Sequence, residues 1–207
     1  MLKILGRNNS SNVQKVMWAV GELGLPHERE DVGGAFGRNK DPAYLAMNPN
    51  GLVPTIIDDG FVLWESNAIV RYLAAKHGAG TLEPKDPQAR ARANQWMDWQ
   101  VSTVGGAIFG AFWGLIRTPA EKRDPAAIKA SQEKTTEALQ MFDAWLAKNA
   151  YAAGTAFSMG DIPLGIMSYR FWQLVPDHPK LPNLKRWYDA IAARPAFRTH
   201  VGSIALT

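Results

Sequence analysis

The sequence predicts an α/β domain followed by an all-α domain, and two observations support this prediction. In the first 80 residues, strand patterns and helical patterns follow in the order βαβ, an irregular segment, then ββα. That order makes a small mixed sheet with helices on its faces. Beyond residue 86 no segment has a strand pattern, and long helical runs follow one another. We therefore expect one domain in residues 1–80, a linker in residues 81–86 and a helical bundle in residues 87–207.

Each element of the first domain has a local signal. Helical spacing of apolar residues predicts helices over residues 12–23 and 66–77, which Gly24 and Gly78 end. A single helical turn is expected around residues 43–47. Asp58-Asp59-Gly60 is a hairpin turn signal between two strands. The four strands are expected in the segments LKILG (2–6), HEREDV (27–32), PTIID (54–58) and FVLW (61–64).

The second domain has clear helix starts. Asp86-Pro87 and Asp124-Pro125 each combine a capping residue with a proline at the first helical position. Ser158 and Asp161 have the spacing of a capping box, and a final amphipathic helix stops before Pro195. The most apolar segment, Val101 to Ile116, has 16 residues and includes four glycines. A membrane helix needs roughly 20 predominantly apolar residues, so we expect a buried helix here.

The composition excludes several classes of function. The net charge of the 207 residues is +4, but the basic residues are scattered, which argues against nucleic-acid binding and suits a small anionic substrate. The absence of cysteine excludes disulfides, thiolate metal sites and a cysteine nucleophile. The four histidines lack metal-ligand spacing, and the N-terminus has no signal-peptide pattern. We expect a cytoplasmic protein without a metal and without a membrane segment.

Three places in the first domain have residues suited to ligand binding. Ser10, Ser11 and Asn12 precede the first helix, where they can cap it or can stabilise the thiolate of a ligand. The Val53–Pro54 bond enters a strand and is either a plain trans proline or a cis bond that presents the Val53 backbone to an extended peptide. At the start of the next predicted helix, Glu65 and Ser66 either cap that helix or bind the ammonium and carboxylate of a zwitterion.

Four motifs in order make the chain resemble the cytosolic glutathione transferases along nearly its whole length. They are NPNGLVPTIIDD, LWESNAIVRYL, FSMGDIPLG and NLKRWYDAIAARPAF. The resemblance implies a thioredoxin-like N-terminal domain that binds glutathione as co-substrate and a helical domain that binds a small hydrophobic electrophile. It also implies a cytoplasmic homodimer that acts in detoxification.

The resemblance assigns roles to individual residues. In the serine-type classes (theta, delta and phi), Ser10 matches the serine that donates to the sulfur of glutathione, with Ser11 and Asn12 as alternatives and Arg7 as a nearby cation. Lys40 matches a phi-type lysine that contacts the glycine carboxylate. The chain departs from the phi pattern at Asn39, which replaces a histidine, and at Leu52, which replaces a glutamine. The implied glutathione-binding residues are Lys40, Leu52, Val53, Pro54, Glu65 and Ser66.

The electrophile site is expected on the helix that contains Gly106, Gly110 and Gly114. The glycine stripe either allows close helix packing or leaves room beside an apolar wall. In the family this helix borders the electrophile, which implies a wall of Phe109, Phe112, Trp113 and Arg117; the alternative is that these aromatics are core. We expect conjugation of glutathione to small apolar electrophiles. Two alternatives stay open, namely glutathione-dependent disulfide or peroxide reduction, and a non-catalytic binding protein of the same fold.

Overall fold

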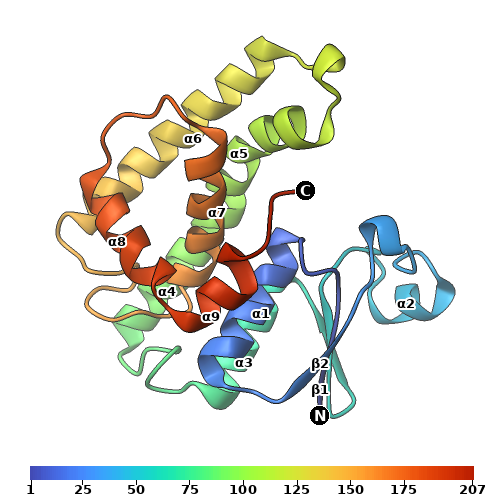
Figure 1. Ribbon diagram of the computed structural model, residues 1–207. Coiled ribbons are helices and arrows are strands. Elements are labelled where there is room, and N and C mark those ends of the chain that lie inside the picture. Colours follow the sequence, from blue (N-terminus) through green and yellow to red (C-terminus); the bar gives the residue numbers. More distant parts are fainter. The chain divides into compact units, whose positions relative to one another are not determined.

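The computed structural model describes residues 1–207, which form two compact units (Figure 1). The first unit contains Met1–Glu83 and Pro195–Ile204, and the second contains Pro84–Arg194 and Ala205–Thr207. The predicted α/β domain followed by a helical domain is confirmed. The division differs from the predicted one at residues 195–204, which belong to the first unit.

The first unit has the predicted order of strands and helices. Its sheet has the strand order β2-β1-β3-β4, with β1 parallel to β2 and antiparallel to β3. The hairpin of β3 and β4 turns at Asp59-Gly60, as the turn signal predicts. The elements are β1 (Leu2–Leu5), α1 (Ser11–Leu23), β2 (His27–Glu30), η1 (Gly34–Phe36), α2 (Pro42–Met47), β3 (Thr55–Asp58), β4 (Phe61–Trp64) and α3 (Ser66–His77).

The sheet of the first unit lies between two helical layers (Figure 1). Helices α1 and α3 pack side by side on one face, where Ile4, Val16 and Leu73 form part of a fully buried cluster. Helix α2 covers the other face, where Tyr44 packs against Leu5. The central strands β1 and β3 therefore contribute to two cores, which suits their short apolar runs in the sequence.

The segment at residues 195–204 packs on α1. It contains α9 (Pro195–Phe197) and η5 (Arg198–Gly202), and Figure 1 shows α9 beside α1. The ring of Phe197 meets the fully buried ring of Trp18 edge-on, with 4.9 Å between the ring centroids. Burying two aromatic side chains against each other stabilises this contact, which explains why the segment belongs to the first unit.

The second unit is entirely helical apart from isolated bridges. The predicted starts at Asp86 and Asp124 are confirmed, because each carboxylate accepts a hydrogen bond from a backbone N–H of the first turn, at 2.8 Å from Ala89 and at 3.0 Å from Ala126. Its elements are α4 (Pro87–Trp99), η2 (Gln100–Val104), α5 (Gly105–Phe112), η3 (Trp113–Arg117), η4 (Ala120–Lys122), α6 (Pro125–Leu146), α7 (Asp161–Leu174) and α8 (Pro182–Ala192).

The prediction of a buried helix over residues 101–116 is wrong. Only 22% of the most apolar window of the continuous helix Pro87–Arg117 is buried. The reason is that only one side of α5 packs on α6, where an added side chain at Gly110 would meet Ser131 and one at Gly114 would meet Ile128. By length and composition alone the helix could cross a membrane, a criterion that core helices and signal sequences also meet.

Asp161 is a fully buried carboxylate at the start of α7. The backbone N–H of Ser158 donates to it at 2.9 Å, as the capping box predicts. The backbone N–H of Ala152 and the indole of Trp187 also donate to it, each at 2.8 Å, which the local pattern does not predict. Burial raises the pKa of Asp161 to about 6, although these donors lower it. The side chain therefore joins three segments of the second unit.

We expect Asp161→Ala to lower the free energy of unfolding by about 3 kcal/mol, because three buried N–H donors lose their acceptor at once. The matched control is Asp124→Ala, which removes an exposed cap and should cost about 1 kcal/mol. Chemical unfolding of both variants measures the difference. Equal losses in the two variants would show that Asp161 is only a local cap.

Candidate functional site

The first unit has a small hollow where three segments meet. It encloses about 40 Å³ between the start of α1, the loop before β3 and the start of α3. The lining residues are Asn12, Asn48, Asn50, Leu52, Val53, Pro54, Glu65 and Ser66. The structure therefore brings together six of the residues singled out in the sequence, from three separate motifs. Ser10, Ser11 and Lys40 are not part of the lining.

A buried chain of hydrogen bonds holds the loop of residues 48–54. The Tyr44 hydroxyl donates to the carbonyl oxygen of Leu52 at 2.6 Å, and Asn48 donates to the same oxygen at 2.8 Å. The Asn48 amide also donates to the Thr55 hydroxyl at 3.0 Å. Because the single Tyr44 proton goes to Leu52, the Thr55 hydroxyl donates to Tyr44 across 2.8 Å. All three side chains are buried, so these bonds are shielded from water.

Sequence patterns did not identify Tyr44 and Asn48 as site residues. Burial raises the pKa of Tyr44, which keeps its hydroxyl protonated and able to donate. The available signal was the NPNG segment, in which an asparagine precedes a turn and can bond to the backbone beyond it. Asn48 does so, since its carbonyl oxygen accepts from the N–H of Asn50 at 3.1 Å.

The turn at Gly51 approaches the backbone and side chain of the preceding loop. Gly51 has φ 59°, and an added Cβ would lie 2.6 Å from Nζ of Lys40 and 2.9 Å from the carbonyl oxygen of Asn39. Only glycine fits this position without displacement. The Asn39 side chain donates to the Gly51 carbonyl at 2.7 Å, and Lys40 donates to the Asn50 carbonyl at 3.3 Å. Lys40 therefore lies beside the turn that leads into the hollow.

The Val53–Pro54 peptide bond is cis, as the motif predicts. The backbone N–H and C=O of Val53 make no hydrogen bond within the chain. Leu52 projects into solvent with 64% of its surface exposed. The backbone of Val53 is thus a free donor and acceptor pair on the wall of the hollow.

Glu65 and Ser66 do not cap α3. Glu65 precedes the helix with φ 72° and ψ 109°, and its side chain makes no capping hydrogen bond. Positive φ in a non-glycine residue costs of order 1–3 kcal/mol and is typical of functional sites. The Ser66 hydroxyl donates instead to the side-chain amide oxygen (Oδ1) of Asn12 at 3.3 Å. The plain-cap interpretation is therefore wrong for both side chains.

Ser10 is the residue that precedes α1, with φ −80° and ψ 125°. Its backbone carbonyl accepts the first helical bond from Gln14, but its hydroxyl makes no capping bond. Ser11 is the first helical residue, and Asn12 follows with its side chain in the hollow. Because Ser66 donates to the Asn12 oxygen, the amide nitrogen of Asn12 remains available to donate to a ligand. Arg7 donates to Asn9 at 2.6 Å.

The residues predicted for a second substrate lie on one helix of the second unit. Phe109 and Trp113 stack with centroids 5.6 Å apart, and more than half of each side chain is exposed. The interpretation of these two aromatics as core is therefore wrong. Phe112 is covered by the guanidinium of buried Arg170, 4.2 Å from the ring centroid, and Arg117 lies 5.8 Å from the same centroid. Phe109 and Trp113 form the exposed aromatic surface of this helix.

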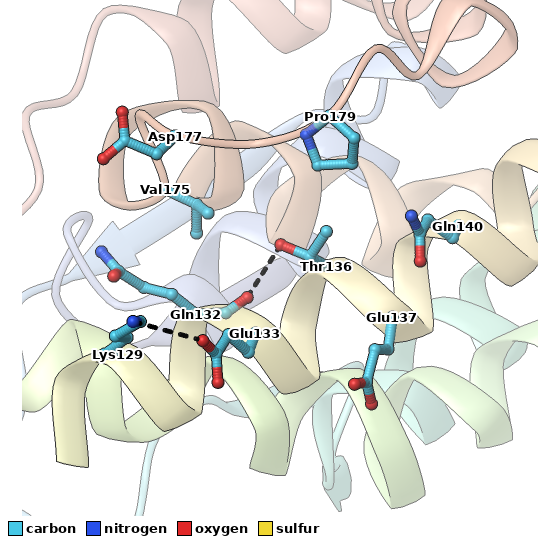
Figure 2. A pocket seen from close by; sticks show the side chains of 9 residues that line it. All are labelled: Lys129, Gln132, Glu133, Thr136, Glu137, Gln140, Val175, Asp177 and Pro179. Atoms are coloured by element: carbon cyan, nitrogen blue, oxygen red, sulfur yellow. Dashed lines mark hydrogen bonds and ion pairs between the residues drawn. The ribbon is translucent and has the colours of Figure 1, made fainter. Parts of the chain in front are cut away.

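A larger groove in the second unit has a different character (Figure 2). It encloses about 490 Å³ between α6 and the segment after α7. Figure 2 shows Lys129 directed toward Glu133, 3.9 Å away, and Thr136 bonded to the backbone of Gln132. Gln132 in turn donates to the carbonyl of Leu174 at 2.6 Å. These polar groups bind one another, and none has the arrangement of a catalytic site.

Comparison with known proteins identifies relatives along the whole chain. The family model of the glutathione S-transferase N-terminal domain matches residues 9–76, and that of the C-terminal domain matches residues 107–195. Glutathione S-transferase GstB of Escherichia coli strain K12 is 46% identical over 200 residues, which are 96% of each chain. Glutathione S-transferase 3 of Zea mays is 33% identical over 213 residues, covering 99% of this chain and 95% of that protein.

A solved structure shares the fold of the whole chain. The theta class glutathione S-transferase from the citrus canker pathogen Xanthomonas axonopodis pv. citri, with glutathione bound, is 48% identical and has a TM-score of 0.95. The match covers 100% of this chain and 99% of that chain. The apo form of the same protein is 42% identical, with a TM-score of 0.87. That match covers 100% of this chain and 98% of the apo chain.

We expect Tyr44→Phe to loosen the loop at residues 48–54, because the Leu52 carbonyl keeps only one of its two donors. The free energy of unfolding should fall by about 1 kcal/mol, and amide hydrogen exchange of residues 51–53 should accelerate. Tyr72→Phe is the control, since the Tyr72 hydroxyl donates to Asp58 at 2.7 Å, outside this loop. Unchanged exchange in the loop of Tyr44→Phe would contradict the positioning role.

Proposed function

The chain belongs to the glutathione S-transferase family, and we propose that its first unit binds glutathione in the hollow beside the Val53–Pro54 bond. The enzyme uses glutathione as co-substrate. One observation carries the site assignment: no side chain caps the start of α3, so the Glu65 carboxylate and the backbone N–H groups of the first turn are available to a ligand. Family membership and this geometry support the same location.

The γ-glutamyl end of glutathione fits the start of α3. Its carboxylate would accept hydrogen bonds from the free backbone N–H groups of the first turn, that of Ser66 included, which favour an anion. Its ammonium would pair with the carboxylate of Glu65, a charge-assisted interaction. The amide of Asn12, oriented by Ser66, would add a donor on the same side.

The middle of the tripeptide fits the loop before β3. Its backbone would pair with the N–H and C=O of Val53, as an added strand does. Leu52 and Pro54 would flank it on the same wall. The glycine carboxylate would lie toward Lys40, whose ammonium is beside the turn at Gly51. These contacts hold the two ends of the ligand and leave its thiol near the start of α1.

Ser10 is the proposed donor to the sulfur. A free thiol has a pKa of about 8.5, so little of it is thiolate at neutral pH. A hydroxyl that donates to the sulfur stabilises the anion, and each pKa unit needs about 1.4 kcal/mol. The Ser10 hydroxyl makes no capping bond, which supports its availability for this role. Asn12 is the second candidate, because its side chain lines the hollow and that of Ser10 does not; Ser11 is the third.

The second substrate is proposed to be a small apolar electrophile that the thiolate attacks to form a thioether. The exposed stack of Phe109 and Trp113 supports an apolar wall, and Phe112 and Arg117 extend it. Disulfide or peroxide reduction on the same site would require exchange between glutathione molecules, since the chain has no cysteine. The available Ser10, Glu65 and Ser66 side chains argue against a non-catalytic binding protein. The proposal includes a homodimer in the cytoplasm, the assembly and location that the family resemblance implies.

Titration of the thiol of bound glutathione by ultraviolet absorbance tests this function directly. A thiol pKa below that of free glutathione supports thiolate stabilisation by the enzyme. An unchanged thiol pKa with saturable binding supports a binding protein, and absence of binding overturns the site.

We expect Ser10→Ala to leave glutathione binding nearly intact, because the ligand is held at its two ends. Losing about 2 kcal/mol of thiolate stabilisation corresponds to about 1.5 pKa units, so the pH–rate profile should move to higher pH by that amount. Activity near neutral pH should then drop more than about tenfold. Ser11→Ala and Asn12→Ala are the comparison variants. If Asn12→Ala moves the profile and Ser10→Ala does not, the amide is the donor.

We expect Glu65→Gln and Ser66→Ala to raise the KM for glutathione far more than the KM for the electrophile. The physical reason is that Glu65→Gln removes the charged partner of the γ-glutamyl ammonium, and Ser66→Ala removes the hydroxyl that orients the Asn12 amide. Glu28→Gln, an exposed carboxylate on β2, is the control. Normal saturation with glutathione in both variants would rule out the anchoring role.

A further inference from the structure

The first unit contains a second pocket that shares no residue with the glutathione hollow. It encloses about 410 Å³ between the edge strand β2, helix α1 and the segment at residues 195–204. Its lining residues are Asn8, Met17, His27, Arg29, Thr199, His200, Ser203 and Ile204. The proposed function uses none of them.

Two rigid walls form this pocket. On β2, His27 and Arg29 are two residues apart, so both side chains project from the same face of the strand. The opposite wall is held on α1 by the contact of Phe197 with Trp18. An added Cβ at Gly21 would lie 2.9 Å from the His200 ring, so glycine permits this close approach.

Each polar side chain of the lining can donate a hydrogen bond, although only Arg29 cannot also accept one. The Asn8 amide, the Thr199 hydroxyl and the His200 ring make no hydrogen bond within the chain. His27 donates from Nδ1 to the carbonyl of Leu25 at 2.9 Å, since a carbonyl can only accept, so its Nε2 is an acceptor in the neutral ring and a donor only in the imidazolium form. Arg29 is oriented by the Gly6 carbonyl at 2.8 Å and by Asp31 at 2.5 Å. No carboxylate lines the pocket.

The charges around the pocket include both signs. Burial lowers the pKa of His200, and the nearby His27 lowers it further. Asp31 pairs with Arg29, and Glu22 accepts a hydrogen bond from Trp18. The charged or titratable groups of the surrounding elements are Arg7, Lys15, Glu22, His27, Glu28, Arg29, Glu30, Asp31, Arg198 and His200.

We propose that this pocket is a second binding site, for a small oxyanion with a carboxylate or phosphate group. Such a group accepts hydrogen bonds from the Asn8 amide, the Thr199 hydroxyl and His200, and its negative charge favours the protonated form of His27, in which Nε2 also donates. A cation would find no acidic ligand in the lining. The inference is independent of the glutathione site, because neither lining residue set includes a member of the other.

Nuclear magnetic resonance of the four histidine side chains tests the proposal in the intact protein. With inorganic phosphate as the probe, the pKa values of His27 and His200 should rise in a saturable manner, because the anion favours their charged forms. His77 and His178 lie outside the pocket and are internal controls. Phosphate should bind about tenfold more tightly near pH 6 than near pH 8. A parallel titration with succinate distinguishes a preference for carboxylate from one for phosphate.

Variants complete the test. His27→Gln and His200→Gln should each weaken phosphate binding and reduce its pH dependence, whereas His178→Gln should change neither. An equal response of all four histidines, or none, would overturn the proposal. Unchanged phosphate affinity in both His27→Gln and His200→Gln would also overturn the proposal. The titration of the wild-type protein gives an answer even where a variant does not fold.

Discussion

The carbonyl oxygen of Leu52 is the point on which the proposed glutathione site depends. It accepts hydrogen bonds from Tyr44 and Asn48, and this pair is buried below the loop that presents Val53. A loop exposed to water would otherwise fluctuate, because fixing each residue of a free backbone costs about 1–2 kcal/mol. Because the hydrogen-bond network fixes the loop when the first unit folds, the conformational entropy is lost during folding and not during ligand binding. The binding surface is therefore pre-organised. Helix α2 thus contributes to the site without lining it.

The two units use their helix starts in different ways. In the second unit, Asp86, Asp124 and Asp161 accept hydrogen bonds from nearby backbone N–H groups and so stabilise the fold. In the first unit, Ser10 precedes α1 and Glu65 precedes α3, yet neither side chain makes a capping bond. Polar residues at helix starts therefore serve stability in the second unit, and in the first unit Ser10 and Glu65 are available for the proposed ligand. An uncapped helix start lowers stability, and such departures from local rules are expected at functional sites.

The segment at residues 195–204 extends the first unit beyond the sheet and its helices. It covers α1 through the contact of Phe197 with Trp18, and it forms one wall of the donor-lined pocket. The groove of Figure 2 has carboxylates at Glu133, Glu137 and Asp177, so the two depressions differ in charge. The absence of carboxylates from the lining of the first unit's pocket suits the oxyanion that we propose for it.

The sequence by itself determined the order of the elements and most of the hollow's lining. Periodicity, turn residues and caps are local properties, which is why the hairpin at Asp59-Gly60 and the starts at Asp86 and Asp124 lie where they were predicted. Only the tertiary structure showed that the Ser66 hydroxyl bonds to Asn12 and does not cap α3, because Asn12 is 54 residues away. It also decided that Phe109 and Trp113 are exposed and that residues 195–204 belong to the first unit. The physical reason is that side-chain contacts between distant residues depend on packing, which local periodicity does not specify.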